Sequence, residues 1–112
     1  MAESKDSRRE INSLIDSLSK RIKIEKAIVF GSMGRGNWDE GSDIDLVIVS
    51  PDFQGKRFRE RAVGLYRFYN LNRPVDLICL TPEEFEKMKD RPTIAKQAID
   101  EGTVVRDSKA RR

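Results

Sequence analysis

The sequence predicts one α/β domain whose mixed β-sheet is flanked by helices. Apolar stripes of helical spacing and short apolar runs rich in strand formers alternate along its 112 residues, in the order α-β-β-α-β-α-α-β. This length fits one domain and leaves no room for a second. We therefore expect a single compact domain over residues 1–112, with a core from about residue 8 to residue 106 and flexible termini.

The N-terminal half supplies the first helix and two strands. Ser7 and Glu10 have the spacing of a capping box, and behind them apolar residues recur on one helical stripe over about residues 8–21. The apolar run at residues 27–30 predicts the first strand. Residues 43–49 begin with two acids and continue as unbroken hydrophobics, which predicts a central strand covered on both faces.

Residues 57–70 predict a helix that carries both an apolar and a basic face. Its apolar stripe includes Tyr66 and Tyr69, so both rings are expected in the core. The basic run at residues 56–61, together with Arg67, is interpreted as the solvated face of this helix. Contacts of this run with phosphates or with a partner are the alternative.

Four further elements complete the expected domain. The apolar run at residues 75–80 predicts a strand. Thr81 as N-cap and Pro82 in the first turn predict the start of a helix. A shorter helix is expected over residues 94–99, and residues 103–105 are expected to add a strand at the edge of the sheet.

The chain contains no histidine and a single cysteine, Cys79, which lies within an apolar run. A buried, reduced and structural thiol is therefore expected. The absence of histidine excludes serine–histidine hydrolysis and histidine metal ligands, and it leaves no imidazole to activate the thiol. Any chemistry must use carboxylates, hydroxyls, backbone groups or a bound metal ion.

Positive and negative charges nearly cancel, leaving a net charge of +3 that the segment 106–112 supplies by itself. The body of the domain is thus close to neutral, which argues against a dedicated nucleic-acid binder. The N-terminus is polar, and no apolar run approaches the ~20 residues of a membrane span. We expect a cytoplasmic protein without a membrane segment.

Asp43 and Asp45 are two apart at the start of the predicted central strand, so their side chains point to the same side. Two carboxylates held side by side repel one another unless a cation lies between them or one is protonated. Mg²⁺ suits such a pair because it prefers oxygen ligands and shares its coordination shell with substrate phosphates. Two solvent-facing acids in a turn are the alternative.

Asp76 is the one acid in the strand predicted at residues 75–80. If this strand lies beside the strand of Asp45, Asp76 completes a three-carboxylate site. Such a site can hold two metal ions ~4 Å apart, the geometry used for displacement at phosphorus. The alternative is an aspartate at a strand end that accepts a hydrogen bond from the turn at residues 73–74.

Gly31 and Ser32 follow the first predicted strand in a turn of small residues. Glycine lets the backbone approach a phosphate closely, and N–H groups and a hydroxyl at a helix start bind the anion. Arg35 is near enough in sequence to add positive charge. The loop does not match the P-loop pattern, because no Gly-Lys-Ser/Thr follows.

Taken together, the motifs consist of Gly31-Ser32, ten residues, and then Asp43-Ile44-Asp45, with Asp76 on a later strand. This arrangement resembles the signature of the DNA polymerase β-type nucleotidyltransferase superfamily. In length and layout the chain is similar to the minimal nucleotidyltransferase branch, whose members carry Gly-Ser-Arg-Ala-Arg-Gly and then Ser-Asp-Ile-Asp-Leu. The matching stretches are Gly31-Ser32-Met33-Gly34-Arg35-Gly36 and Ser42-Asp43-Ile44-Asp45-Leu46.

The resemblance covers about residues 10–106, and the segments at residues 75–77 and 101–105 also look like that branch. One position departs from the pattern: Met33 replaces the first arginine of the loop and removes a positive charge, whereas Arg35 is retained.

The resemblance implies a role for each motif. Asp43, Asp45 and Asp76 would hold two Mg²⁺ ions, with Asp76 on the ion that activates the acceptor hydroxyl. Gly31, Ser32 and Arg35 would bind the phosphates of ATP. The hydroxyl would attack the α-phosphorus and displace pyrophosphate.

The resemblance also suggests the acceptor. Larger relatives carry a second domain for it, and minimal members are often antitoxins paired with a helical HEPN-type ribonuclease toxin. The leading hypothesis is therefore an antitoxin that transfers AMP to a tyrosine of such a toxin, in a hetero-oligomer with it. The alternatives are an antitoxin that neutralises its partner by binding alone, and nucleotidyl transfer to a small molecule or to an RNA end.

Overall fold

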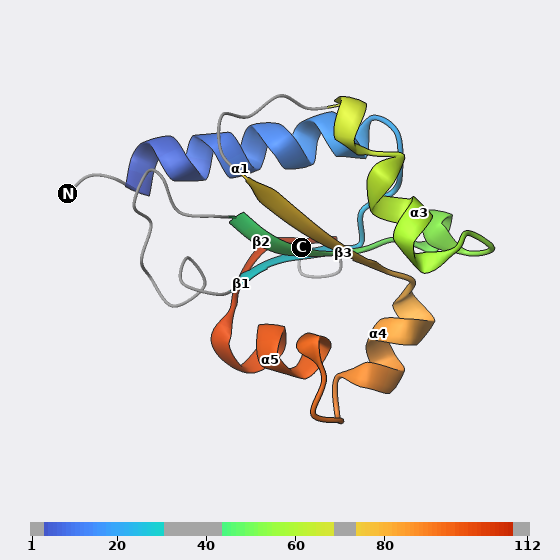
Figure 1. Ribbon diagram of the computed structural model, residues 1–112. Helices are drawn as coiled ribbons and strands as arrows, with labels where there is room; N and C mark the ends of the chain where they lie inside the picture. Colours follow the sequence, from blue (N-terminus) through green and yellow to red (C-terminus); the bar gives the residue numbers. More distant parts are fainter. Residues whose placement is uncertain (1–3, 31–43, 69–73, 109–112) are drawn as a thin grey trace.

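The computed structural model describes residues 4–30, 44–68 and 74–108. Its elements follow the predicted order, with two short 3-10 helices, η1 and η2, added (Figure 1). In chain order they are α1 (Ser4–Ser19), β1 (Lys26–Phe30), β2 (Ile44–Val49), η1 (Pro51–Phe53), α3 (Phe58–Val63), η2 (Tyr66–Phe68), β3 (Val75–Leu80), α4 (Pro82–Met88), α5 (Ile94–Glu101) and β4 (Thr103–Asp107).

The four described strands form one mixed sheet in the order β3-β2-β1-β4. β2 pairs in parallel with β3 and antiparallel with β1, and β4 pairs antiparallel with β1 at the edge. The α/β class, the mixed sheet and the edge position of the last strand are therefore confirmed.

Helices cover both faces of the sheet, with α1 on one side and α4 and α5 on the other (Figure 1). Successive residues of β2 alternate between these sides: Leu46 and Ile48 pack in the cluster that contains the α1 residues, and Val47 and Val49 pack with Phe85 of α4. The prediction that β2 is a central strand covered on both faces is confirmed.

The first helix begins earlier than predicted, at Ser4. Ser7 is thus inside α1, and the predicted capping box with Glu10 is wrong, because a residue within a helix does not occupy its N-cap. At the other end α1 stops at Ser19, and the backbone N–H groups of Arg21 and Ile22 both donate to the carbonyl of Leu18. This bonding closes the last turn.

The helix predicted over residues 57–70 is shorter and changes type. α3 ends at Val63, and the chain continues past Gly64 into the 3-10 turn η2. Because the angular spacing of side chains changes there, Leu65 lies in the core and Tyr66 remains 44% exposed. The prediction of Tyr66 in the core is wrong, and Tyr69 lies outside the described residues.

The helix start at Thr81 is confirmed. The Thr81 hydroxyl accepts a hydrogen bond from the backbone N–H of Glu84, and the Glu84 carboxylate accepts one from the backbone N–H of Thr81.

Among the described residues, no helix has the length and apolar character needed to cross a membrane.

Candidate active site

Asp45 of β2 and Asp76 of β3 are direct partners across the parallel pairing of the two strands. Neighbouring strands lie about 4.8 Å apart, so the two residues stand side by side. The backbone N–H of Ile44 donates to the carbonyl of Pro74 over 2.9 Å, which ties the starts of the two strands together. The strand pairing thus brings together two acids that are 31 residues apart in the sequence.

Both side chains point to the face of the sheet that carries α4 and α5. Asp45 alternates with Leu46 and shares its face with Val47, whereas Asp76 shares its face with Ile78. Val47 and Ile78 both belong to the cluster on the α4 side. Asp45 is half-buried and Asp76 is exposed, so the pair lies where this face reaches solvent at the start of the two strands.

The pairing between β1 and β2 extends this row by one residue. Phe30, the last residue of β1, is the partner of Asp45. Phe30, Asp45 and Asp76 therefore lie in line across three strands, on one face. The chain leaves β1 beside Asp45 for the segment 31–43, which contains four of the predicted site residues.

Those four residues, Gly31, Ser32, Arg35 and Asp43, lie outside the described residues. Within residues 4–30, 44–68 and 74–108, no group of three acidic, histidine or cysteine side chains is placed to hold a metal ion. In that part of the chain the available donor set at the start of β2 and β3 is the pair Asp45 and Asp76. Carboxylate oxygens at adjacent positions are suitable ligands for a divalent cation of the Mg²⁺ type.

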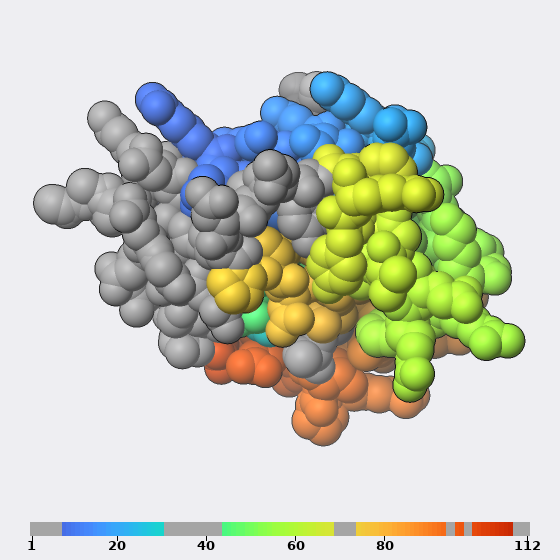
Figure 2. Space-filling view, turned by 45° about the horizontal axis from the view of Figure 1, so that its top comes forward, coloured from blue at the N-terminus to red at the C-terminus, as the bar shows by residue number. Residues whose placement is uncertain are grey.

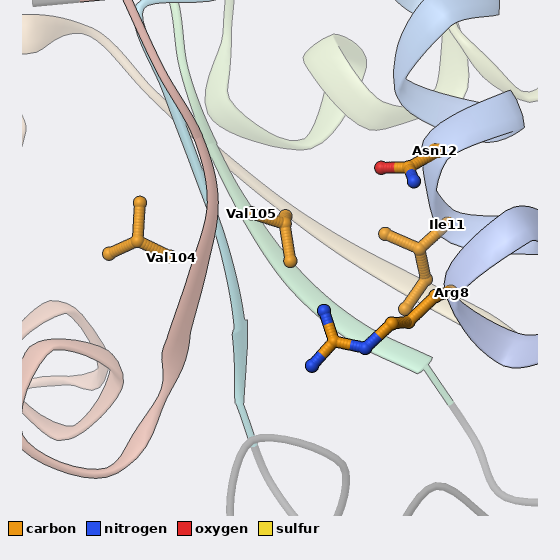
Figure 3. Close-up of a pocket in the computed structure, with 5 residues that line it drawn as sticks. All are labelled: Arg8, Ile11, Asn12, Val104 and Val105. Carbon is orange, nitrogen blue, oxygen red and sulfur yellow. The ribbon is translucent and has the colours of Figure 1, made fainter. Parts of the chain in front are cut away.

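A cavity of about 280 Å³ lies on the opposite side of the sheet (Figure 3). It is formed between α1 and β4, and its lining includes Arg8, Ile11 and Val105. Ile11 and Val105 pack in the cluster on the α1 side. The cavity therefore does not open on the face that carries Asp45 and Asp76.

Sequence reasoning missed the role of one charged residue, Arg61. It was assigned to a solvated face, but its side chain is only 7% exposed. Its guanidinium donates to the Cys79 carbonyl over 3.1 Å and to both carboxylate oxygens of Glu84 over 2.6 and 3.1 Å. The signal was its position beside Ala62 and four residues before Leu65, at the margin of the buried face.

Arg61 also changes the titration of its neighbours. Its hydrogen bonds to Glu84 are the main reason that the pKa of this carboxyl lies below its ordinary value. Burial raises the pKa of the Cys79 thiol to about 12, against a smaller lowering by the charge of Arg61. Cys79 is free and buried, so the prediction of a buried, reduced thiol is confirmed. Arg61 and Glu84 thus stabilise the end of β3 that is remote from Asp76.

Comparison with known proteins identifies relatives that match nearly the whole chain. "Putative protein adenylyltransferase" of Methanocaldococcus jannaschii is 29% identical over 98 residues, which cover 82% of this chain and 91% of that protein. The crystal structure of "a putative nucleotidyltransferase" from Sulfolobus solfataricus superposes with a TM-score of 0.66 at 20% identity, covering 98% of this chain and 92% of the other. At that identity, the likeness establishes the fold.

The family model of the nucleotidyltransferase domain matches residues 11–105, from the middle of α1 to the middle of β4. This match includes both strands that carry the paired acids and the segment 31–43. Members of this family generally use a nucleoside triphosphate and a divalent metal ion. The chain belongs to the nucleotidyltransferase domain family.

Proposed function

We propose that this nucleotidyltransferase transfers AMP from ATP to a hydroxyl group of a protein, using Mg²⁺ held by Asp43, Asp45 and Asp76. The observation that carries the proposal is the register of β2 and β3, which pairs Asp45 with Asp76 on one face of the sheet. Among the described residues, no lysine or arginine pairs with Asp76. A bound metal ion would therefore relieve the repulsion of the two carboxylates.

The chemistry follows from these donors. Asp43, Asp45 and Asp76 would hold the Mg²⁺ ions, which would lower the pKa of the acceptor hydroxyl and stabilise the negative charge on the phosphoryl oxygens. Asp76 is exposed and accepts the hydroxyl proton, because the chain has no histidine for that task. The hydroxyl oxygen bonds to the α-phosphorus, the bond from this phosphorus to the bridging oxygen breaks, and pyrophosphate leaves.

The segment that follows β1 supplies the contacts to the nucleotide in this proposal. Backbone N–H groups near Gly31, the Ser32 hydroxyl and the Arg35 guanidinium bind the phosphates. Support comes from Phe30, since this residue ends β1 directly beside Asp45 and so starts the segment at the carboxylate pair. Met33 contributes no charge to these contacts.

The protein acceptor is supported by the Methanocaldococcus jannaschii relative, which is named as an adenylyltransferase of proteins. The narrower form of the proposal is an antitoxin whose acceptor is a tyrosine of a helical HEPN-type ribonuclease toxin, with which the chain forms a hetero-oligomer. In this form, the bulky charged AMP on the tyrosine silences the toxin.

A second function has one observation in its favour. Met33 stands where the minimal nucleotidyltransferases carry an arginine, which weakens the charge available to ATP. The chain would then neutralise the toxin by contact, without transfer. The two functions differ in whether the toxin carries AMP after neutralisation.

The test combines the chain with a HEPN-type ribonuclease from the same organism, Mg²⁺ and ATP labelled at the α-phosphate. We expect label on a tyrosine of the ribonuclease and loss of ribonuclease activity. Asp76→Asn removes one charge at nearly constant volume and should lower the transfer rate by about 100-fold or more. Asp90→Asn makes the same change at an exposed position in the turn after α4 and should transfer at the wild-type rate.

Three outcomes would decide between the functions. Transfer at the wild-type rate by Asp76→Asn would refute the role of this carboxylate. Neutralised ribonuclease without label would establish the binding function. Transfer of labelled AMP to a molecule other than the ribonuclease would support the transferase activity and refute the proposed acceptor.

A further inference from the structure

Exposed apolar side chains are concentrated in one short stretch of the chain. Among the described residues four large hydrophobic side chains are exposed, and three of them, Phe58, Val63 and Tyr66, lie on α3 and η2. Their exposed fractions are 55%, 67% and 44%. In Figure 2, α3 and η2 form a continuous part of the outer surface, drawn in yellow-green and yellow. Isolated exposed hydrophobics are common, whereas three of them within residues 58–66 point to an interaction surface.

Positive charges surround this group. Lys56, Arg57, Arg59 and Arg67 are all exposed, and Glu60 is the one exposed acid between them. No ion pair with a described residue engages Lys56, Arg57 or Arg59. Arg57, Phe58, Arg59 and Glu60 together line an open hollow of about 440 Å³. We define residues 56–60, Val63, Tyr66 and Arg67 as the α3 surface.

We propose that the α3 surface docks an acidic segment of the acceptor protein, with an apolar side chain in the hollow and carboxylates against the surrounding cations. An apolar centre with a charged rim is the usual composition of a protein–protein interface. The excess of exposed positive charge selects a partner of negative charge and accelerates its association. The inference rests on the proposed function in so far as the docked protein is the acceptor of AMP.

A protein segment fits this surface better than a nucleic acid. Binding of single strands requires aromatic rings with free faces for stacking. The guanidinium of Arg61 already lies 5.8 Å from the centroid of the Phe58 ring. Val63, the most exposed of the three hydrophobics, has no ring. Its aliphatic side chain matches the apolar side chains of a protein.

The surface is separate from the carboxylate pair. α3 packs against β3 through Arg61, which binds the carbonyl of Cys79 near the end of that strand, whereas Asp76 lies near its start. In Figure 1, α3 lies on the right, near the end of β3 that leads into α4. A docked partner would therefore leave Asp76 accessible, and docking and transfer can be changed independently.

The binding test uses two labelled helical peptides that share a leucine stripe and carry either glutamates or lysines beside it, together with an oligouridine strand. We expect the glutamate peptide to bind in a salt-dependent manner and the lysine peptide not to bind. Arg57→Glu/Arg59→Glu should weaken its binding by about tenfold or more. Arg9→Glu/Arg91→Glu, an equal charge change at exposed positions elsewhere, should leave it unchanged. The proposal would be overturned if oligouridine bound more tightly than the glutamate peptide, or if neither peptide bound.

A second variant and a second measurement separate docking from folding and from catalysis. Val63→Gln replaces the most exposed hydrophobic with a polar side chain and should also weaken peptide binding, with an unchanged melting temperature. Asp76→Asn should bind the glutamate peptide like the wild type although its rate of AMP transfer is lowered. In the transfer assay, Arg57→Glu/Arg59→Glu should raise KM for the acceptor protein and leave KM for ATP unchanged. An unchanged KM for the acceptor protein would refute docking at this surface and would not contradict the proposed function.

Discussion

At the residue scale, the alternation of side chains along each strand places Asp45 and Asp76 on the same face of the sheet. On the same face, Asp45 is followed by the buried Val47, and Asp76 by the partly buried Ile78, which packs against the same cluster. An acid can stand in such a row only where the row reaches solvent, and both do so at the start of their strands. The proposed divalent cation would offset the repulsion between two carboxylates at adjacent positions.

Arg61 is the charged residue whose removal should cost the most stability. Its guanidinium bonds the carbonyls of Lys56 and Cys79 as well as Glu84. Arg61→Met keeps much of the volume but leaves the buried Cys79 carbonyl without this donor, so the free energy of unfolding should fall by about 2 kcal/mol. Urea denaturation measures the change.

Arg59→Met is the matched control for that experiment. Arg59 is exposed on the same helix, so its replacement should alter the free energy of unfolding by no more than about 0.5 kcal/mol. Equal effects of the two substitutions would mean that the Arg61 bonds do not stabilise the fold.

The Arg61–Glu84 pair should also make stability depend on pH. The pKa of Glu84 lies below its ordinary value of 4.5, mainly because of the hydrogen bonds from Arg61. Its charged form therefore adds stability that is present above the unfolded-state pKa and is lost as pH falls through the folded-state pKa. Unfolding free energies of the wild type and Glu84→Gln, measured from about pH 7 to about pH 3, should converge at the acidic end. A difference that is constant with pH would contradict this linkage.

At the residue scale, the sequence was sufficient for the faces of Asp45 and Asp76 but not for Arg61. The two-residue period of a strand assigns a face without knowledge of any partner. The environment of Arg61 depends on Glu84 and Cys79, which come from α4 and β3. A run of four arginines and lysines with one acid gives no sign of which member is buried, since that is decided by packing.

At the scale of elements, local chemistry was predictable wherever a few neighbouring residues decide it. Thr81, Pro82 and Glu84 form the cap of α4 by themselves, and the predicted start is correct. α3 fails for the opposite reason: its apolar pattern continues past Gly64, but the chain changes to a 3-10 turn there. The prediction assumed a helix of constant period over this stretch, and it therefore placed Tyr66 in the core, which is wrong.

The cap of α4 can be tested separately. Thr81→Ala removes the acceptor for the backbone N–H of Glu84, so the free energy of unfolding should fall by about 1 kcal/mol. Thr81→Ser keeps the hydroxyl and should retain most of that stability. Thermal unfolding of both variants provides the measurement, and equal losses would show that the hydroxyl bond contributes nothing.

At the scale of the whole molecule, the sheet order decides whether a site exists. The sequence predicted the class and the sequence of elements, and the hypothesis of a three-acid site assumed that β3 lies beside β2. Only the order β3-β2-β1-β4 and the parallel register supply that neighbour relation. Strand alternation alone leaves the order undetermined, because it constrains faces and not partners.

The same topology relates the two proposals. The parallel strands β2 and β3 begin together at the carboxylate pair, and Arg61 joins α3 to the end of β3. The sheet therefore holds the carboxylate pair and the α3 surface in a fixed relation while keeping them apart. A partner that uses both must extend along the strands from one end of the sheet to the other.

The central claim is that Asp45 and Asp76 hold a divalent metal ion, and diffraction tests it most directly. Crystals of the chain would be grown with Mn²⁺ in place of Mg²⁺ and a non-hydrolysable ATP analogue, and anomalous scattering would locate the metal. We predict an anomalous peak within about 2.5 Å of a carboxylate oxygen of both residues, which Asp76→Asn weakens or removes. A bound nucleotide whose metal ion contacts neither Asp45 nor Asp76 would contradict the claim.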